Sequence, residues 1–542
     1  MFGRMETTKS RANKAGYFSL DSWPNLASAP PPTSTGSLTW KLTAALLAIG
    51  LAWRLLRYFL QFPVWGDEAF IVVNLLDRGY LDLLKPLDYK QVAPVLFLWS
   101  ELTVYRLLGG SELAIRRLPF LAGVGSLFLF WRLARSTLNH AAALLAVGIF
   151  AVSYYPIRHS CEVKPFAFDL FWSLALLVPA VNWLVRPNPW GWLALLAALV
   201  PMALGASYPS IFVAGAVSLV FVPAVWQKRE PKTWVLFALY NLATGISFLI
   251  FYRTAGVEQF DSTGGTTNWY WSEWFPPAKP IELVQWLASV HTGNMMAYPA
   301  GGSGGASALT LILCLLGIWQ LWRNRSILLL CLLPFGLTFL AAAMHHYPYG
   351  GSARVAQHLA PAICLLAGSG AAALIDRFAK SEIARRRSLV GVSAMLAIIG
   401  IAGMVRDWER PYKTSADAQL RDIVVGITGQ AKPDDQIVVM DSPEEVASPF
   451  VWYLGQLKDR VAWRGQIDWG RFNDSPPHNL WCLYLTRDLS RRDAVMSALP
   501  PAQHPLVLAG HEEFNLQFGQ SYETLEHCEV FHWLCLQPGN VR

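Results

Sequence analysis

The chain has 542 residues, of which 54% are hydrophobic and only 15% are charged, and its formal net charge is +7 at pH 7. Soluble globular proteins normally carry about 25% charged residues, so this composition excludes an ordinary soluble enzyme and indicates a membrane protein. The basic residues lie between apolar segments rather than in one tail or patch. This distribution favours membrane orientation signals and argues against a nucleic-acid partner.

The N-terminal segment, residues 1–36, is polar and rich in Pro, Ser and Thr, with no early apolar core. We therefore expect a disordered cytoplasmic tail and no cleavable signal peptide. The following residues, 37–411, predict one α-helical polytopic membrane domain, because apolar segments of about 20 residues recur along them. The eleven predicted transmembrane helices lie near 40–60, 115–134, 141–158, 166–185, 190–207, 210–227, 233–252, 305–322, 326–344, 357–375 and 389–406.

The short connections between alternate segments carry Lys or Arg. Positively charged short loops stay in the cytoplasm, so this alternation predicts a cytoplasmic N-terminus and an outward-facing set of longer loops, 61–114 and 253–304. The basic connections are Arg132–Arg135, Arg186, Gln227–Lys232, Arg323–Arg325 and Arg377–Arg387.

Residues 94–108 are apolar but contain Glu101 and Arg106. They are too short and too polar for a span, so we expect an amphipathic helix in the outer interface, and 284–290 predicts a second such piece.

The C-terminal residues, 412–542, predict a soluble α/β domain outside the membrane. Residues 436–441 and 480–486 resemble short buried strands bounded by Pro, Asp and Asn, and 449–456 and 491–499 resemble helices. Neither a phosphate-binding Gly loop nor a catalytic triad pattern occurs in this region.

An acidic pair, Asp67 and Glu68, follows directly after the first apolar segment. Carboxylates are costly near hydrocarbon, so this pair is a functional candidate. Adjacent residues on a helix point in different directions, so at most one of them faces a given atom. The alternative is that Asp67 only caps a helix that begins near Ala69.

Three further outer segments carry candidate binding residues. Lys90 suits a phosphate and Gln91 a substrate hydroxyl, although Lys90 alternatively extends to lipid headgroups. Glu162 and Lys164 follow the third apolar segment, where they alternatively pair with neighbours.

The third of these segments contains Tyr347 and Arg354, and a guanidinium suits an anionic headgroup. His345, His346 and His358 are a weak metal pattern because no carboxylate stands at ligand spacing, so we predict no metal site.

These motifs together resemble a known family. The segments Pro-Val-Trp-Gly-Asp67-Glu68-Ala, Lys90-Gln-Val-Ala-Pro and Leu-Leu-Gly-Gly-Ser-Glu-Leu-Ala-Ile-Arg-Arg-Leu-Pro119 are similar to the start of C-class membrane glycosyltransferases. The closest similarity is to glycosyltransferase family 39, which includes protein O-mannosyltransferases and lipid A aminoarabinose transferases. It covers residues 40–255 well and the Tyr347–Arg354 element moderately.

The resemblance implies transfer of a sugar from a polyprenyl-phosphate donor to a lipid, glycan or protein hydroxyl on the extracytoplasmic face of, we expect, a bacterial inner membrane. It implies that Asp67 is the catalytic base and that Glu68 belongs to its site. Lys90, Lys164 and Arg354 would then stabilise the departing phosphate, and Glu162 matches an acidic position of the relatives.

No cofactor is implied, and assistance by a divalent cation stays open. Two departures concern the donor's ligands: the Lys90 segment lacks the double Pro or Glu-Lys-Pro of relatives, and Ala206–Ser210 lacks their Thr-His-Tyr. The alternatives are a transporter or flippase of a lipid-linked or anionic substrate, and a non-catalytic assembly or receptor protein.

Overall fold

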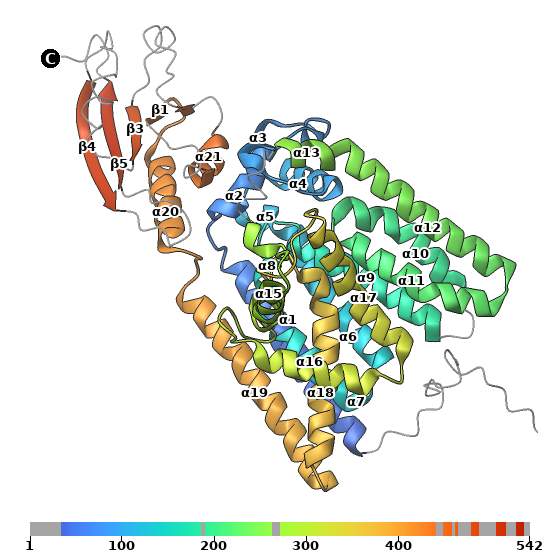
Figure 1. Ribbon diagram of the computed structural model, residues 1–542. Coiled ribbons are helices and arrows are strands. Elements are labelled where there is room, and N and C mark those ends of the chain that lie inside the picture. The colour runs from blue at the N-terminus through green and yellow to red at the C-terminus, as the bar shows by residue number, and fades with distance from the viewer. Residues whose placement is uncertain are drawn as a thin grey trace, which may run out of the picture.

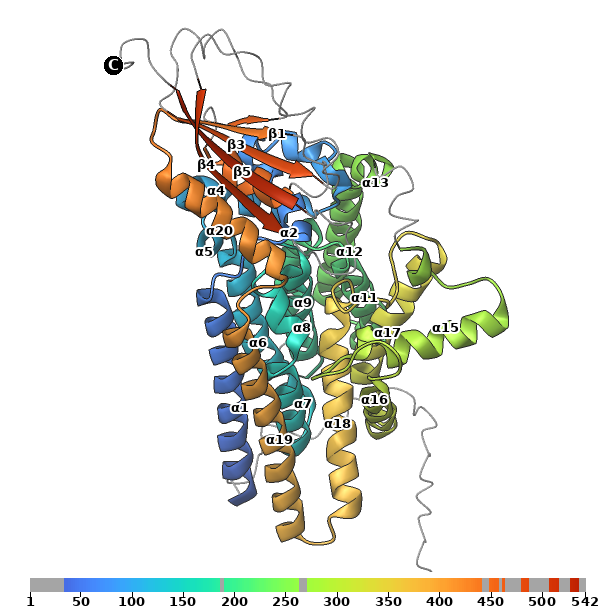
Figure 2. The same cartoon turned by 90° about the vertical axis from the view of Figure 1, so that its left-hand side faces the viewer.

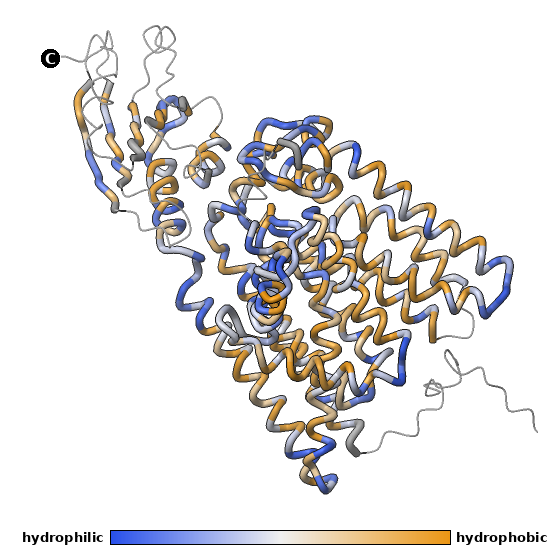
Figure 3. The backbone as a smooth tube through the Cα atoms, in the orientation of Figure 1, coloured by the Kyte–Doolittle hydropathy of each residue, from blue (hydrophilic) through white to orange (hydrophobic). Residues whose placement is uncertain are grey.

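The molecule consists of an elongated helical bundle with a small β-sheet at one end (Figures 1 and 2). Hydrophobic residues predominate along the bundle helices, whereas hydrophilic residues gather at the bundle ends and in the connections (Figure 3). The computed structural model describes residues 34–185, 190–262, 271–440, 448–457, 461–463, 479–486, 506–515 and 527–535. The predicted N-terminal tail through residue 33, Arg186 and the predicted helix 491–499 lie outside these described residues.

Among the described residues, eight helices are long and apolar enough to cross a membrane, which confirms a polytopic helical membrane protein. They are α1 (Ser34–Phe59), α6 (Arg117–Thr137), α9 (Phe166–Val185), α11 (Ser210–Lys228), α12 (Pro231–Phe251), α17 (Arg325–Ala343), α18 (Ala360–Phe378) and α19 (Glu382–Glu409). The three other predicted spans correspond to the shorter apolar helices α7 (His140–Ala151), α10 (Trp190–Ala206) and α16 (Ala308–Leu321). The number eleven therefore stays a prediction.

The prediction of one continuous helix at 141–158 was wrong. Helix α7 ends at Ala151, and a separate short helix, α8 (Tyr154–His159), begins after an extended Ser153. Pro156 explains the break, because its ring removes the N–H that a continuous helix would direct at the carbonyl of Val152. The break lets α8 and the turn after it leave the bundle axis.

Close helix packing in the bundle depends on small residues. A Cβ atom on Gly317 of α16 would collide with the backbone carbonyl of Leu366 in α18, and one on Gly370 would collide with the carbonyl of Leu313. Small residues at such crossings let helix backbones approach closely where the hydrophobic effect contributes little.

The long loop after α1 forms a compact layer over one end of the bundle. Its elements are α2 (Gly66–Val72), α3 (Asn74–Asp77), η3 (Asp82–Leu84), η4 (Asp88–Lys90), α4 (Val95–Leu108) and α5 (Glu112–Ile115). The predicted interfacial helix at 94–108 is thus a helix, and the one at 284–290 lies within α15 (Pro280–Thr292). The remaining loop elements are η5 (Tyr252–Gly256), α13 (Val257–Ser262), η6 (Ser272–Trp274), η7 (Asn294–Met296) and η8 (Gln357–Leu359).

The C-terminal region forms a five-stranded mixed sheet with the order β2-β1-β3-β5-β4. Strand β1 pairs in parallel with β2 and β3, whereas β5 pairs antiparallel with β3 and β4. The elements are α20 (Ser415–Gln430), β1 (Gln436–Met440), α21 (Ser448–Gly455), β2 (Val461–Trp463), β3 (Asn479–Thr486), β4 (Leu506–Asn515) and β5 (His527–Cys535). The predictions of β1, α21 and β3 are confirmed, and the domain division at residue 412 stays a prediction.

The C-terminal region contacts the loop layer directly. Trp452 of α21 is fully buried in a hydrophobic cluster that otherwise consists mainly of loop-layer residues such as Leu75 and Leu102. The hydroxyl of Tyr453 donates to Glu112 at 2.9 Å and accepts from the backbone N–H of Val64 at 2.8 Å. These contacts attach α21 of the C-terminal region to the loop layer, at the residues immediately before α2.

Candidate active site

Asp67 lies in the first turn of α2, at the centre of a cluster of charged side chains. Its Oδ1 lies 3.1 Å from Nζ of Lys164, and its Oδ2 accepts a hydrogen bond of 3.1 Å from Nη1 of Arg354. These three residues come from parts of the chain up to 287 positions apart. The Asp67 side chain is 14% exposed, so the carboxylate is enclosed but accessible.

The capping alternative for Asp67 was wrong. Helix α2 begins at Gly66, its N-cap is Trp65, and no side chain caps it. Asp67 instead directs both oxygens at the two cations.

The neighbouring cations keep Asp67 ionised. Burial alone would raise the pKa of Asp67, but Lys164, Arg354 and Lys413 together hold that pKa below its ordinary value. Burial lowers the pKa of Lys164, and Asp67 opposes that effect. The carboxylate is therefore deprotonated, and the two cations can hold an anion beside it.

Gln91 orients Lys164. Nζ of Lys164 donates to Oε1 of Gln91 at 2.8 Å, and Nε2 of Gln91 donates to the carbonyl of Tyr89 at 3.0 Å. Tyr89 and Lys90 have left-handed backbone conformations, with φ of 57° and 51°, and the Lys90 side chain is exposed. The structure therefore brings Gln91 to the cluster through Lys164 and leaves Lys90 at its exterior.

Glu68 faces away from this cluster. It is fully buried, and its two oxygens accept a two-pronged interaction from Arg116, with Nε at 2.7 Å and Nη2 at 2.5 Å. The backbone N–H of Val163 also donates to Oε1 of Glu68 at 2.8 Å. This geometry corrects the placement of Glu68 among the catalytic residues: it ties α2 to the segments that carry Arg116 and Lys164, so it is a positioning residue.

Arg116 was not among the predicted site residues. Besides binding Glu68, it donates to the carbonyls of Phe62 and Pro63, so one buried guanidinium fixes the chain just before α2. Burial would lower the pKa of Arg116, but Glu68 reverses this effect and raises it. The adjacent Arg116 and Arg117 at the start of α6 were the available signal, but the sequence does not show which of the two faces inward.

Glu162 belongs to a second ion cluster beside the first. It accepts from Nε of Arg158 at 2.7 Å and lies 2.8 Å from Nδ1 of His159. Burial would raise the pKa of Glu162, but Arg158 and His159 hold it well below its ordinary value. Glu162 therefore pairs with its neighbours, which was the alternative interpretation, and it helps to hold the turn that carries Lys164.

Tyr347 holds the loop of Arg354. Its hydroxyl donates to the carbonyl of Val355 at 2.9 Å. Gly351 in this loop has a φ of 66°, and a Cβ atom there would collide with the ring of Trp274, over which the Arg354 guanidinium lies at 5.8 Å. Only glycine combines this backbone with such a close approach. Tyr347 therefore positions Arg354, and its hydroxyl is engaged within the protein.

The described part of the chain contains no group of three or more His, Cys, Asp or Glu side chains that could hold a metal ion. Nε2 of His358 lies 2.9 Å from the hydroxyl of Thr338, and the ring of His345 packs on Phe275. His358 and His345 thus each contact another side chain of the fold.

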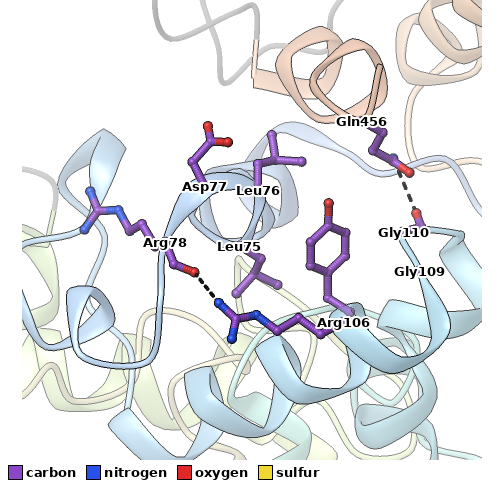
Figure 4. Close-up of a pocket in the computed structure, with 9 residues that line it drawn as sticks. Leu75, Leu76, Asp77, Arg78, Arg106, Gly109, Gly110 and Gln456 are labelled. Carbon is purple, nitrogen blue, oxygen red and sulfur yellow. Dashed lines mark hydrogen bonds between the residues drawn. The ribbon is translucent and has the colours of Figure 1, made fainter. Parts of the chain in front are cut away.

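A cavity of about 450 Å³ lies between the loop layer and α21, and it contains none of the predicted site residues (Figure 4). Nη2 of Arg106 points to the carbonyl of Arg78, and Gln456, which directly follows α21, points to the carbonyl of Gly110. The cavity is lined by Leu75, Leu76, Asp77, Arg78, Tyr105, Arg106, Gly109, Gly110 and Gln456.

Comparisons with known proteins agree with this architecture. Residues 92–252 match the family model of dolichyl-phosphate-mannose-protein mannosyltransferases. The crystal structure of apo ArnT from Cupriavidus metallidurans is similar to this chain, with a TM-score of 0.52 and 13% sequence identity. The similarity covers 92% of this chain and 98% of the ArnT chain. The chain therefore has the fold of ArnT, and its residues 92–252 are similar to the mannosyltransferase family.

A second structure of the same ArnT, bound to undecaprenyl phosphate, is similar to this chain with a TM-score of 0.50 and 13% identity, and the similarity covers 92% of this chain and 98% of the ArnT chain. A search of curated proteins gives no match. The segment matched by the family model contains Glu162 and Lys164 but neither Asp67 nor Arg354. The case for Asp67 and Arg354 therefore depends on the geometry of the charged cluster.

Proposed function

We propose that this protein is a glycosyltransferase that moves a sugar from a polyprenyl-phosphate-linked donor to an acceptor hydroxyl of a lipid, glycan or protein, with Asp67 as the catalytic base. The observation that carries this proposal is the ionised, accessible carboxylate of Asp67 between Lys164 and Arg354. The complex of ArnT with undecaprenyl phosphate supports a lipid-phosphate donor on the same fold.

In the proposed reaction the acceptor oxygen attacks the anomeric carbon of the sugar while Asp67 takes the proton of the acceptor hydroxyl. The bond between the anomeric carbon and the phosphate oxygen breaks, and its electron pair leaves with the polyprenyl phosphate. Lys164 and Arg354 stabilise the negative charge that develops on this leaving group. A single displacement of this kind inverts the anomeric configuration.

The charges around Asp67 favour such a donor. Four cationic side chains, Arg158, Lys164, Arg354 and Lys413, surround two carboxylates, Asp67 and Glu162. An anionic phosphate would balance the surplus of positive charge, because uncompensated charge in a partly desolvated site is costly. The polyprenyl tail would stay in the lipid while its phosphate reaches these cations.

The proposed active site faces the extracytoplasmic side. The Arg135 guanidinium at the end of α6 lies 5.7 Å from the ring of Trp40 near the start of α1, at the bundle end opposite to Asp67. Lys228 at the end of α11 lies over Trp183 near the end of α9. This clustering of basic residues at helix ends supports a cytoplasmic N-terminus in, we propose, a bacterial inner membrane.

The test is donor turnover by the purified protein in detergent micelles, with a mixture of radiolabelled polyprenyl-phosphate sugars and extracted membrane lipids and proteins as acceptors. A glycosyltransferase releases free polyprenyl phosphate and labels an acceptor without any sealed membrane. If the donor stays intact in micelles but crosses the bilayer of sealed vesicles that contain the protein, the chain is a carrier and the proposal is wrong.

A further inference from the structure

The connection between α19 and α20 passes beside Trp65, directly before α2, and it is attached to the rest of the protein at both ends. Before it, Asp407 accepts from Nε1 of Trp53 at 2.8 Å and pairs with Nη1 of Arg57 at 2.9 Å, both on α1. After it, Nη1 of Arg421 donates to the carbonyl of Gln61 at 2.6 Å. The connection between α19 and α20 lies between these two attachments, so its course beside the N-terminus of α2 is fixed.

Lys413 is the cationic residue that this connection presents to the site. It directly precedes Thr414, the N-cap of α20, whose hydroxyl accepts from the backbone N–H of Asp417 at 3.2 Å. Nζ of Lys413 lies over the ring of Trp65, the residue that caps α2 immediately before Gly66 and Asp67. The guanidinium of Arg158 lies 5.6 Å from the same ring, so Trp65 contacts two cations.

The amine of Lys413 belongs electrostatically to the cluster of Asp67. Burial and Arg158 lower the pKa of Lys413 to about 7, while Glu162 and Asp67 oppose that effect. Part of the side chain remains exposed, so the amine is accessible to a ligand that enters the site. The structure gives Lys413 no carboxylate within salt-bridge distance among the described residues, whereas Lys164 and Arg354 each touch Asp67.

We infer that Lys413 is a third cationic ligand of the donor phosphate, supplied by the C-terminal side of the chain to complete the site formed by Lys164 and Arg354. This inference rests on the proposed function. Lys413 would hold the phosphate from the side opposite to the membrane bundle, so the docked C-terminal region takes part in donor binding. A phosphate beside it would favour the charged form of its amine.

The test measures the dissociation constant of undecaprenyl phosphate, with uncharged undecaprenol as the neutral probe, for wild type, Lys413→Ala and Lys413→Arg. We expect Lys413→Ala to weaken binding of undecaprenyl phosphate about tenfold and to leave undecaprenol binding unchanged, because one charge-assisted contact is lost. Lys413→Arg should recover most of the affinity. The matched control is Arg410→Ala, which removes an exposed positive charge three residues away and should bind like wild type.

Two results would overturn the inference: undecaprenyl phosphate binding by Lys413→Ala within twofold of wild type, or an equal loss in Arg410→Ala. If Lys413→Ala unfolds, Lys413→Gln replaces it under the same criteria. Failure of the proposed function is recognised separately, because wild type would then bind undecaprenyl phosphate no better than undecaprenol.

Discussion

The buried pair of Glu68 and Arg116 gives a prediction about how the active site is held. Arg116→Met removes the guanidinium but keeps most of its apolar volume. It leaves the carboxylate of Glu68 with the Val163 N–H as its one remaining hydrogen-bond partner among the described residues. The side chains of Glu68 and Arg116 are 0% and 4% exposed, so water cannot replace the lost contact. Breaking one side of such a buried pair costs about 3–5 kcal/mol.

The double variant separates this cost from the intrinsic value of the pair. Glu68→Leu combined with Arg116→Met removes both charges, and we expect it to recover much of the stability lost in Arg116→Met, because apolar replacements of buried ion pairs are often neutral or stabilising. The two carbonyls of Phe62 and Pro63 lose their donor in both variants, so recovery should be incomplete.

The assay is thermal unfolding in detergent, followed by tryptophan fluorescence, for wild type, both single variants and the double variant. We expect the lowest melting temperature for Arg116→Met and an intermediate one for the double variant. The reasoning is refuted if Arg116→Met melts with wild type. It is equally refuted if the double variant regains stability while its donor turnover stays at the level of Asp67→Asn, since Glu68 would then act in the chemistry.

Substitutions at two other residues, Arg354 and Glu101, each test a single feature of the structure. Arg354→Ala should weaken undecaprenyl phosphate binding about 10- to 100-fold and Arg354→Lys less, because a charged hydrogen bond contributes about 1.5–3 kcal/mol; unchanged affinity in Arg354→Ala would contradict its phosphate role. Glu101 is fully buried, and neither of its oxygens has a hydrogen-bond partner within the described segments. Burial, and to a smaller extent the charge of Glu68, raise the pKa of Glu101 well above its ordinary value. The folded state favours the protonated form of Glu101, so the wild type loses stability as the pH rises above the pKa of this carboxyl in the unfolded state. The melting temperature of Glu101→Gln should therefore rise relative to that of wild type between about pH 5 and pH 8. A constant difference across that range would contradict this assignment.

The sequence predicts the helices of this protein better than their ends. Long apolar segments such as 166–185 coincide with their helix because hydrophobicity and length suffice to define them. The break after Ala151 is local and depends on Pro156, which a smooth apolar pattern hides. Strand β4 was not predicted because its second half, from Gly510 to Asn515, is mostly polar and is held by pairing with β5 rather than by an apolar core pattern.

For the charged cluster, too, the local sequence shows the residue types but not the contacts that depend on packing. Asp67, Lys164 and Arg354 were predicted individually, because charged residues next to apolar segments stand out in the sequence. Their contacts, and the opposite orientation of Glu68, depend on packing between distant segments. Lys413 was not identified, because nothing in its local sequence shows that the connection after α19 passes Trp65.

Asp67→Asn is the most direct test of the central claim, and it is measured as donor turnover and donor affinity in the same preparation. Asn keeps the size of the side chain but cannot accept the acceptor proton, and Asp82→Asn on η3 of the same loop layer serves as the control. The account predicts that Asp67→Asn folds and binds the polyprenyl-phosphate sugar but turns it over at least about 10²-fold more slowly, whereas Asp82→Asn matches wild type. Turnover by Asp67→Asn within a few-fold of wild type would contradict the account.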